Sequence, residues 1–449
     1  MNEGLPEDAR EANEGLFEDV KERLAGIYPY RINGRVNQVV GLVIEGKGPL
    51  SSVGDSALIY PLDDASPIPA EVVGFRDGKT MLMPLGDLRG IGIGSRILSR
   101  KSAVTARAGE GILGRVIDGL GNPMDGKGPL DAVDSIPIHQ DTANPMKKLR
   151  IRAPLDLGVR SINGLLTCGK GQRMGIFAGS GVGKSVLLGM VARHTEAQVN
   201  VIGLIGERGR EVREFIEKDL QEGIGRSVVV VATSDQPPVI RVRAAFLTIA
   251  LAEYFRDRGN DVLLLMDSLT RFAMAQREIG LAIGEPPTSK GYPPSVFSLL
   301  AKLLERAGNG EGEGTMTAIY TVLVEGDDLD DPIADAARSI LDGHIVLSRK
   351  LANENQYPAV DVLKSVSRIM KDIVPPEQTG HAGKIVEILS EYERAEDLVN
   401  IGAYVSGSNK RIDYALSMMD KVRLFLRQKS EEKATLENTM DSMRILFCA

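Results

Sequence analysis

Hydrophobic and polar positions divide the 449-residue chain into regions of different character. Near the amino terminus, Leu16, Val20 and Leu24 recur at helical spacing among acidic residues, which predicts a short amphipathic helix. Such a helix either docks on its own domain or serves as a handle for a partner helix, and the pattern leaves both possibilities open.

Short β-branched runs follow, from Arg31 to about Leu98, and Gly, Pro and Asp separate them. The runs are Val39–Ile44, Ser56–Tyr60, Glu71–Val73 and Thr80–Met83. Strands at this spacing predict a small β-barrel.

Longer apolar runs alternate with helical segments in the middle of the chain. A Gly- and Pro-rich stretch, Gly119–Pro137, first leads into Arg152–Asp156 and marks the passage to this region. Because the runs are continuous rather than alternating, they predict a parallel sheet covered on both faces. The runs are Met174–Phe177, Val201–Ile205, Val228–Ala232, Val262–Met266 and Ala318–Leu323.

The last part of the chain shows helical periodicity with Lys- and Glu-rich faces, beginning soon after Pro375 and Pro376. We therefore expect an α/β core between a barrel and a helical domain. The expected segments are an amphipathic helix at 1–27, a barrel at 28–100, the core at 101–375 and a carboxy-terminal helical domain at 376–449.

Composition narrows the class of protein. A chain of 449 residues exceeds the roughly 250–300 that one core supports, and 43% hydrophobic with 26% charged residues is typical of globular domains. The net charge of −7 gives no support to nucleic-acid binding, so no such partner is expected.

Cysteine usage and hydropathy bear on the compartment. Cys168 and Cys448 belong to no metal-binding or disulfide pattern, which fits a reducing environment. No apolar run reaches the length of a membrane helix, and the amino terminus is acidic, unlike that of a signal peptide. We expect a cytoplasmic protein, at most peripheral to the inner face of the cell membrane.

A phosphate-binding loop stands directly after the strand that ends at Phe177. Glycines there let backbone N–H groups turn toward a phosphate, Lys184 neutralises its charge, and the Ser185 hydroxyl suits Mg²⁺. The strict Walker A pattern has Gly where Ala178 stands. The sequence thus predicts ATP and Mg²⁺ as ligands of Ala178, Gly179, Ser180, Gly181, Val182, Gly183, Lys184, Ser185 and Val186.

Two acidic residues follow other strands of the predicted sheet. Asp267 ends the apolar run from Val262, where a Walker B carboxylate reaches the metal. An isolated Asp after an apolar strand is more often a helix cap, but the phosphate loop upstream favours the Walker B role. Glu207 follows Ile205 and is placed to activate the attacking water, although its charged neighbours up to Glu214 also suit a solvated helix start.

Several blocks together resemble the catalytic subunit family of rotary ATPases and secretion ATPases. They are Ala178–Ser185, Gly206–Val212, Asp267–Arg271, Gly326–Pro332 and Tyr357–Asp361, and the resemblance covers about residues 30–430. The longer blocks Phe177–Met190, Met266–Arg277, Gly284–Pro287 and Gly291–Val296 are most similar to the ATPases of flagellar export, followed by those of injectisomes.

The resemblance implies a RecA-like P-loop fold, a homohexamer with sites between subunits, and further site residues. Arg208 matches an arginine beside the phosphates, and Arg271 matches an arginine that lines the site. Tyr357 matches the ring that stacks on adenine, and Arg368 matches the arginine finger of a neighbouring subunit. It also implies a stator-like partner at the amino-terminal helix, a stalk protein, export substrates and chaperones, and an export gate at the membrane.

The phosphate loop and its acidic partners predict MgATP hydrolysis, and the resemblance implies that this hydrolysis powers flagellar protein export. An injectisome ATPase is the nearest alternative. An ATP synthase catalytic subunit is disfavoured, because its acidic carboxy-terminal run is expected where this chain has Arg394 inside Glu391–Asp397. A ring RNA helicase should show a basic, aromatic pore loop, which we do not find. A scaffold without activity would need a damaged site, yet Lys184 and both acids are present.

Overall fold

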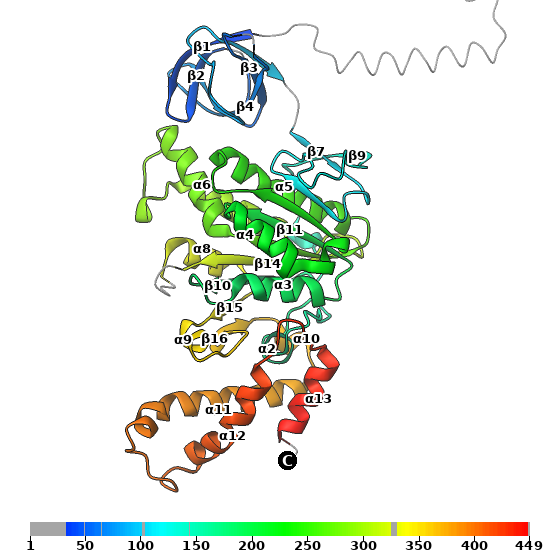
Figure 1. Ribbon diagram of the computed structural model, residues 1–449, viewed down its shortest axis with the longest axis vertical. Helices are drawn as coiled ribbons and strands as arrows, with labels where there is room; N and C mark the ends of the chain where they lie inside the picture. The colour runs from blue at the N-terminus through cyan, green and yellow to red at the C-terminus, as the bar shows by residue number, and fades with distance from the viewer. Residues whose placement is uncertain are drawn as a thin grey trace, which may run out of the picture. The chain divides into compact units, whose positions relative to one another are not determined.

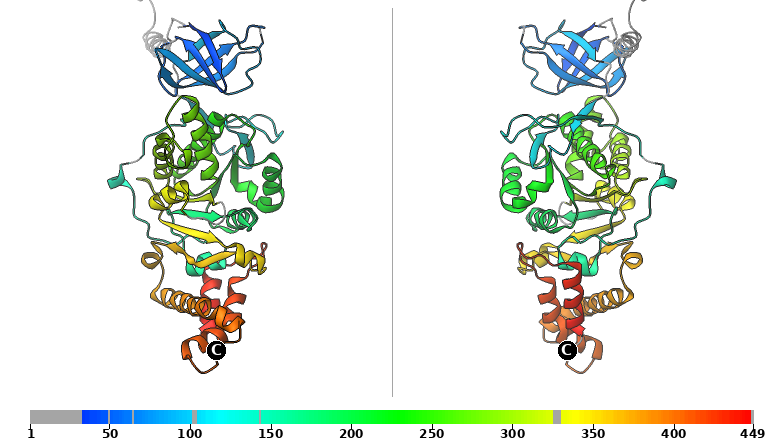
Figure 2. Two further views of the ribbon diagram at one scale, coloured as in Figure 1. Left: turned by 90° about the vertical axis from the view of Figure 1, so that its left-hand side faces the viewer. Right: turned by 90° about the vertical axis from the view of Figure 1, so that its right-hand side faces the viewer.

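The computed structural model describes residues 33–447, except 49, 64, 101–103, 143 and 325–329. The chain divides between residues 103 and 104 into two compact units, which we treat separately (Figures 1 and 2). The amphipathic helix expected at residues 1–27 lies outside the described residues, as does part of the block Gly326–Pro332.

The first unit is a closed six-stranded barrel, in the strand order β1-β2-β5-β4-β3-β6. Ile44, Ile59, Leu82 and Ile97 point inward and are fully buried, so alternate residues of each strand make the barrel core. The strands are β1 Asn33–Val40, β2 Val43–Lys47, β3 Ser56–Tyr60, β4 Ile68–Arg76, β5 Lys79–Pro84 and β6 Arg96–Arg100.

One expected strand of this barrel is a hairpin. The run Val39–Ile44 was predicted as continuous, but the chain turns at Gly41 and Leu42, and Val40 pairs with Val43. Gly41 has φ +56°, a left-handed backbone that glycine adopts without steric cost. The turn was not predicted, because the only indication of it within the hydrophobic run is one glycine.

The second unit is built on an eight-stranded sheet, in the order β16-β15-β10-β14-β13-β11-β12-β8. Neighbouring strands are parallel except β16, which is antiparallel to β15. The sheet strands are β8 Arg115–Asp118, β10 Arg173–Ala178, β11 Val199–Ile205, β12 Ser227–Ala232, β13 Asp261–Asp267, β14 Thr315–Leu323, β15 Gly343–Leu347 and β16 Val360–Ser367.

All five apolar runs expected in this region are strands of the sheet. Sequence patterns did not indicate β8, β15 and β16, which are edge strands or lie beside one. Because β8 precedes the Gly- and Pro-rich stretch Gly119–Pro137, that stretch lies within the second unit. A separate two-stranded sheet pairs β7 Thr105–Ala108 with β9 Asp134–Pro137.

Helices cover both faces of the sheet, as the continuous apolar strands predict. On one face α5 packs on β11, β12 and β13, and α6 packs on β14; on the other, α3 shares a hydrophobic core with β11. The α-helices of this part of the second unit, up to Ile373, are α2 Arg160–Leu165, α3 Lys184–His194, α4 Gly209–Glu214, α5 Pro238–Arg256, α6 Leu269–Ala282, α7 Pro294–Arg306, α8 Pro332–Ile340, α9 Arg349–Asn353 and α10 Met370–Ile373. Short turns are η1 Pro145–Lys147, η2 Phe215–Leu220, η3 Gln221–Arg226 and η4 Ser289–Gly291.

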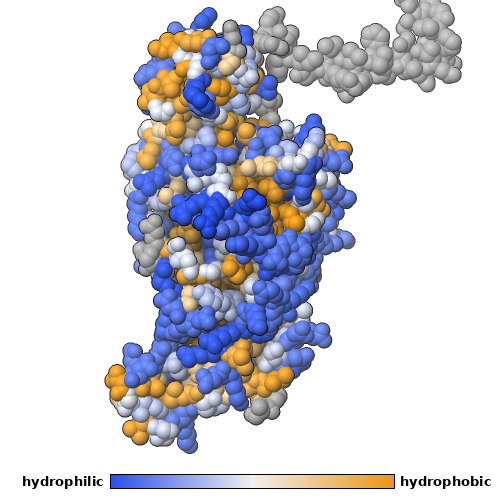
Figure 3. Space-filling view, viewed as in Figure 1, coloured by the Kyte–Doolittle hydropathy of each residue, from blue (hydrophilic) through white to orange (hydrophobic). Residues whose placement is uncertain are grey.

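Three helices complete the second unit: α11 Pro376–Asn400, α12 Lys410–Leu426 and α13 Leu436–Phe447 (Figure 1). Buried residues such as Ile388 and Val422 join the core shared with α3. At the far end of α11 and α12, Leu398, Ile401 and Val405 are exposed, and hydrophobic side chains show on this part of the surface (Figure 3). The expected fold class, a parallel α/β core with an N-terminal barrel and a C-terminal helical part, is confirmed.

In the part of the chain that the structure describes, no helix combines the length and the apolarity needed to cross a membrane.

A buried ion pair holds α5 to α7. The Arg306 guanidinium, 1% exposed, donates to Glu253 at 2.5 and 3.0 Å and to the Ile138 carbonyl at 2.8 Å. Glu253→Ala would leave this charge buried and unpaired, so we expect urea unfolding to show a loss of about 3–5 kcal/mol. Glu217→Ala, which breaks an exposed pair with Arg213, should change stability little. Equal losses in both variants would contradict the assignment.

Candidate nucleotide site

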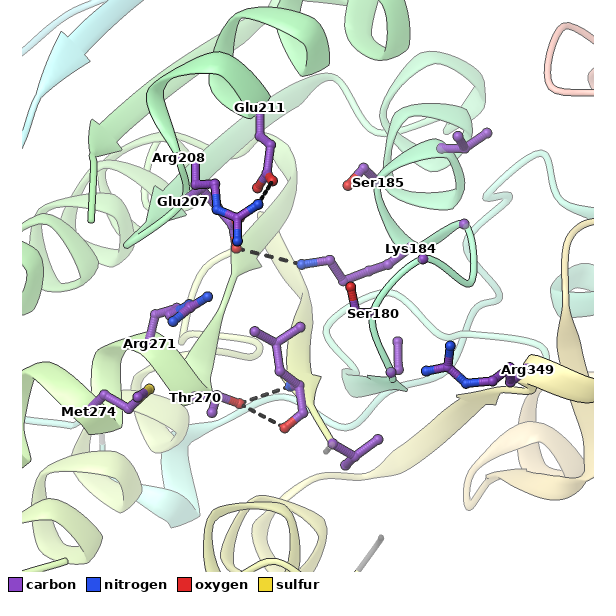
Figure 4. Close-up of a pocket in the computed structure, with 17 residues that line it drawn as sticks. Ser180, Lys184, Ser185, Glu207, Arg208, Glu211, Thr270, Arg271, Met274 and Arg349 are labelled. Carbon is purple, nitrogen blue, oxygen red and sulfur yellow. Dashed lines mark hydrogen bonds and ion pairs between the residues drawn. The ribbon is translucent and has the colours of Figure 1, made fainter. Parts of the chain in front are cut away.

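The phosphate loop joins the end of β10 to the start of α3 (Figure 4). Gly181 and Gly183 have φ +77° and +90°, so both use the backbone freedom that the motif requires. Ala178, the departure from the strict pattern, is still a strand residue paired with Leu323 and Leu347. Its backbone is extended, which explains why alanine serves at this position.

Lys184 meets both predicted acidic residues at the carboxyl ends of the strands. Its Nζ lies 2.5 Å from Asp267 Oδ1 and 3.7 Å from Glu207 Oε1. Asp267 is 4% exposed, and the Thr321 hydroxyl donates to the same oxygen at 2.7 Å. Side chains from four parts of the chain thus form one cluster, in the place where parallel sheets bind ligands: Lys184, Glu207, Asp267 and Thr321.

The pKa of Glu207 is raised to about 7, chiefly by burial and then by the nearby Asp267 carboxylate, while the Lys184 ammonium opposes the shift. Its Oε1 is buried and makes no hydrogen bond within the described residues. A carboxyl group with a pKa near the working pH is suited to accept a proton.

Ionisation of Glu207 should also cost stability in the protein without nucleotide. Its pKa in the folded state lies above the ordinary value of 4.5, so the cost is absent below pH 4.5 and grows as the pH rises toward 7. Glu207→Gln should therefore raise the melting temperature at pH 8 and have little effect at pH 5. Glu214→Gln, on the exposed α4, is the charge-matched control. The same shift at both pH values would contradict ionisation as the cause.

A cavity of about 660 Å³ opens over the loop. It is lined by most of the predicted residues; Val182 and Asp267 are buried and are not among its lining residues. Sequence reasoning missed the other lining residues, although each lies at or just after the carboxyl end of a strand, or in the first two turns of a helix. The missed residues are Glu211, Thr270, Met274, Leu323, Val324 and Arg349.

A second cavity, of about 860 Å³, adjoins the first, since Gly183 and Val186 line both. Tyr357 lies here, 43% exposed, and a β-carbon placed on Gly183 would lie 3.4 Å from its ring. The structure therefore brings Tyr357 beside the phosphate loop. Residues 427–432 also line this cavity, and the sequence carried no signal for them.

Arg271 and Arg208, the two arginines predicted at the site, lie in different environments. Arg271 lies in the first turn of α6 and packs closely against Gly206. A β-carbon placed on Gly206, which has φ +72°, would lie 2.7 Å from Arg271 Cβ. Its Nε is buried without a hydrogen bond to any described residue. Arg208 is 77% exposed and pairs with Glu211 at 3.3 Å. Both line the first cavity.

Arg368 lies away from these residues of its own chain. It directly follows β16, and its N–H donates to the carbonyl of Asp342, which precedes β15. The phosphate loop instead follows Ala178, which pairs with Leu347 at the other end of β15. Four residue steps at about 3.3 Å separate Gly343 from Leu347, roughly 13 Å along the strand. Arg368 therefore lies at the amino ends of the parallel strands, and its own phosphate loop lies at their carboxyl ends.

Oxygen donors suited to Mg²⁺ are present. The Ser185 hydroxyl lines the cavity and the Asp267 carboxylate lies beside Lys184. In the described residues no three His, Cys, Asp or Glu side chains form a metal-binding group. Mg²⁺ characteristically uses one or two protein oxygens together with water and substrate phosphates, so these two residues fit it.

Comparison with known proteins relates both parts of the second unit to known families. Residues 158–367 match the ATP synthase alpha/beta family, nucleotide-binding domain, and residues 374–444 match the T3SS EscN ATPase C-terminal domain. A flagellum-specific ATP synthase of Bacillus subtilis is 54% identical over 93% of this chain and 95% of its own length.

Solved structures agree with these matches. The assembled ATPase EscN of the enteropathogenic E. coli type III secretion system has a TM-score of 0.87 and 42% identity, over 92% of this chain and 99% of that one. EscN in complex with its central stalk EscO has a TM-score of 0.85, with the same identity and coverage. The chain belongs to the ATP synthase alpha/beta family, among the flagellum-specific ATP synthases and type III secretion ATPases.

Proposed function

We propose that this ATPase hydrolyses MgATP in a homohexameric ring and so powers protein export through a flagellar type III apparatus. The observation that carries the reaction is the convergence of Lys184, Asp267 and Glu207 at the phosphate loop. The flagellar assignment rests on the similarity to the flagellum-specific ATP synthase. The EscN-type carboxy-terminal match favours export over ATP synthesis.

In this proposal the chain's own groups position the phosphates and move one proton. Lys184 would exchange its contact with Asp267 for the γ-phosphate, and Ser185 and Asp267 would hold Mg²⁺, whose charge would stabilise the phosphate oxygens. The Glu207 carboxylate orients the attacking water and accepts its proton. Arg208 and Arg271, which line the first cavity, would face the charge that develops on the phosphates, and Tyr357 would stack on the adenine base.

Arg368 would complete the site of the neighbouring subunit. Its place at the opposite edge of the sheet supports this role, because a ring built by head-to-tail contacts brings opposite faces of successive subunits together. EscN is assembled and binds a central stalk, and we propose both properties for this chain, with the exposed end of α11 and α12 as the stalk contact.

The remaining partners belong to the same proposal. The segment 1–27 would bind a stator-like protein, and the ring would work on substrates and chaperones beside the export gate, on the cytoplasmic face of the membrane. The four segments 1–27, 28–100, 101–375 and 376–449 remain our proposed domain division.

The activity is tested by phosphate release from MgATP, with Lys184→Ala as the inactive control. The export role is tested in the source bacterium, where the same substitution should stop secretion of filament subunits. Phosphate release without any export defect would assign the ATPase to another machine.

A further inference from the structure

The segment 427–432, between α12 and α13, contains a buried glutamine with an unusual set of partners. Gln428 is 6% exposed, and its side-chain amide donates to the carbonyls of Gly158 at 2.8 Å and Glu432 at 2.7 Å. Its Oε1 accepts from the backbone N–H of Arg160 at 2.7 Å. One side chain therefore ties this segment to the start of α2.

The backbone of the same residue reaches the second cavity. The Gln428 N–H donates to the carbonyl of Tyr357 at 2.9 Å, and Tyr357 lies against Gly183 of the phosphate loop. Gln428, Gly183 and Tyr357 all line this cavity. The position of Tyr357 is thus fixed from a segment some 70 residues further along the chain, and the amide of Gln428 fixes that segment.

Arg160 strengthens the same attachment. Its guanidinium donates to the carbonyls of Phe425 at 3.1 Å and Arg427 at 2.9 Å, and it pairs with Glu432. The cavity wall is consequently held at both ends, before and after Gln428. Buried hydrogen bonds of this kind set a geometry, because each unpaired group would cost free energy.

We infer that Gln428 is a positioning residue for the base of the nucleotide: it holds Tyr357 and the 427–432 wall at the spacing that a purine needs. The inference rests on the proposed function and adds to it a residue outside every phosphate-binding motif. Because the triphosphate would occupy the first cavity, Gln428 should affect affinity for the base and leave phosphate binding and the chemical step unaltered.

The chain offers a matched control in Gln378 of α11, 3% exposed. Its amide also joins a carboxy-terminal helix to α2, donating to the carbonyl of Asn163 and the hydroxyl of Thr167, both at 2.9 Å. It lines neither cavity. Replacing either glutamine by methionine keeps the length of the side chain and removes its hydrogen bonds, so both variants should lose stability.

Calorimetric titration of the full chain with MgADP and with magnesium tripolyphosphate separates the roles. Gln428→Met, which removes all three hydrogen bonds of the side chain, should weaken MgADP binding by about tenfold and leave tripolyphosphate binding within about twofold. Gln378→Met should leave both within about twofold, and KM for ATP should rise in Gln428→Met with kcat unchanged. If Gln428→Met does not fold, Gln428→Asn replaces it; its shorter side chain retains the amide. It should likewise weaken the binding of MgADP more than the binding of tripolyphosphate.

Equal weakening of both ligands, or equal effects of the two glutamine variants, would overturn the inference and leave the proposed function standing. In a Tyr357→Ala background the effect of Gln428→Met on MgADP should disappear, and full persistence would also overturn it. Failure of the unaltered protein to bind MgADP would overturn both the inference and the proposed function.

Discussion

Glu207→Gln is expected to lower the turnover of ATP by at least about 100-fold while leaving MgATP affinity within about tenfold. Glutamine keeps the size of the side chain and cannot accept the proton of the attacking water. The phosphate-binding groups of Lys184 and the loop remain. The loss should therefore appear in kcat, which phosphate release measures, while calorimetry measures the affinity.

The control for this substitution is Glu214→Gln, at the last residue of α4. Glu214 is partly exposed, pairs with Arg210 at 3.1 Å and does not line the cavity. It removes the same charge and should retain turnover within a few-fold. If Glu207→Gln instead lost MgATP binding, with no further loss of turnover, the carboxylate would be a binding or structural group.

Activity is expected to return when two inactive variants, Lys184→Ala and Arg368→Ala, are mixed in equal amounts and allowed to exchange subunits. Each should be nearly inactive alone, and an arginine finger is worth roughly 10³- to 10⁵-fold in rate. A mixed interface can take its phosphate loop from the arginine variant and its finger from the lysine variant. Each condition is met about half the time, so about a quarter of interfaces should be intact if heterologous contacts assort randomly.

The control mixture contains Lys184→Ala and the double variant Lys184→Ala with Arg368→Ala. It has no intact loop, so no exchange can restore a site. Coupling between sites can hold recovery below a quarter, and the presence of recovery is the criterion. If labelled subunits demonstrably share rings and no activity returns, Arg368 acts within its own chain, against its position at the far edge of the sheet.

The stability effects predicted for Glu253→Ala and Glu207→Gln should depend differently on pH. The pair Glu253–Arg306 is buried, so its loss should matter at every pH at which both groups are charged. The cost at Glu207 should appear only as the pH rises above its ordinary pKa. The same burial that raises the pKa of Glu207 toward the working pH also makes its ionisation destabilising when no nucleotide is bound.

Local patterns in the sequence determined the strands of the central sheet, the phosphate loop and its two acidic partners. These features are recognisable because strand burial and helix periodicity are repeated over neighbouring residues, and the loop needs glycines at fixed spacing. The carboxyl-edge position of Glu207 and Asp267 followed from the parallel sheet alone. The turn at Gly41 was missed because one glycine in a hydrophobic run is a weak signal.

Only the tertiary structure decided which distant residues meet. It set Arg368 at the edge opposite its own phosphate loop, because β16 returns antiparallel to β15. It placed Gln428 behind Tyr357, a contact across the chain that no periodicity encodes. It also set the pKa of Glu207, since burial and the distance to Asp267 depend on how separate strands pack. Sequence patterns report on neighbours along the chain, whereas these properties arise from neighbours in space.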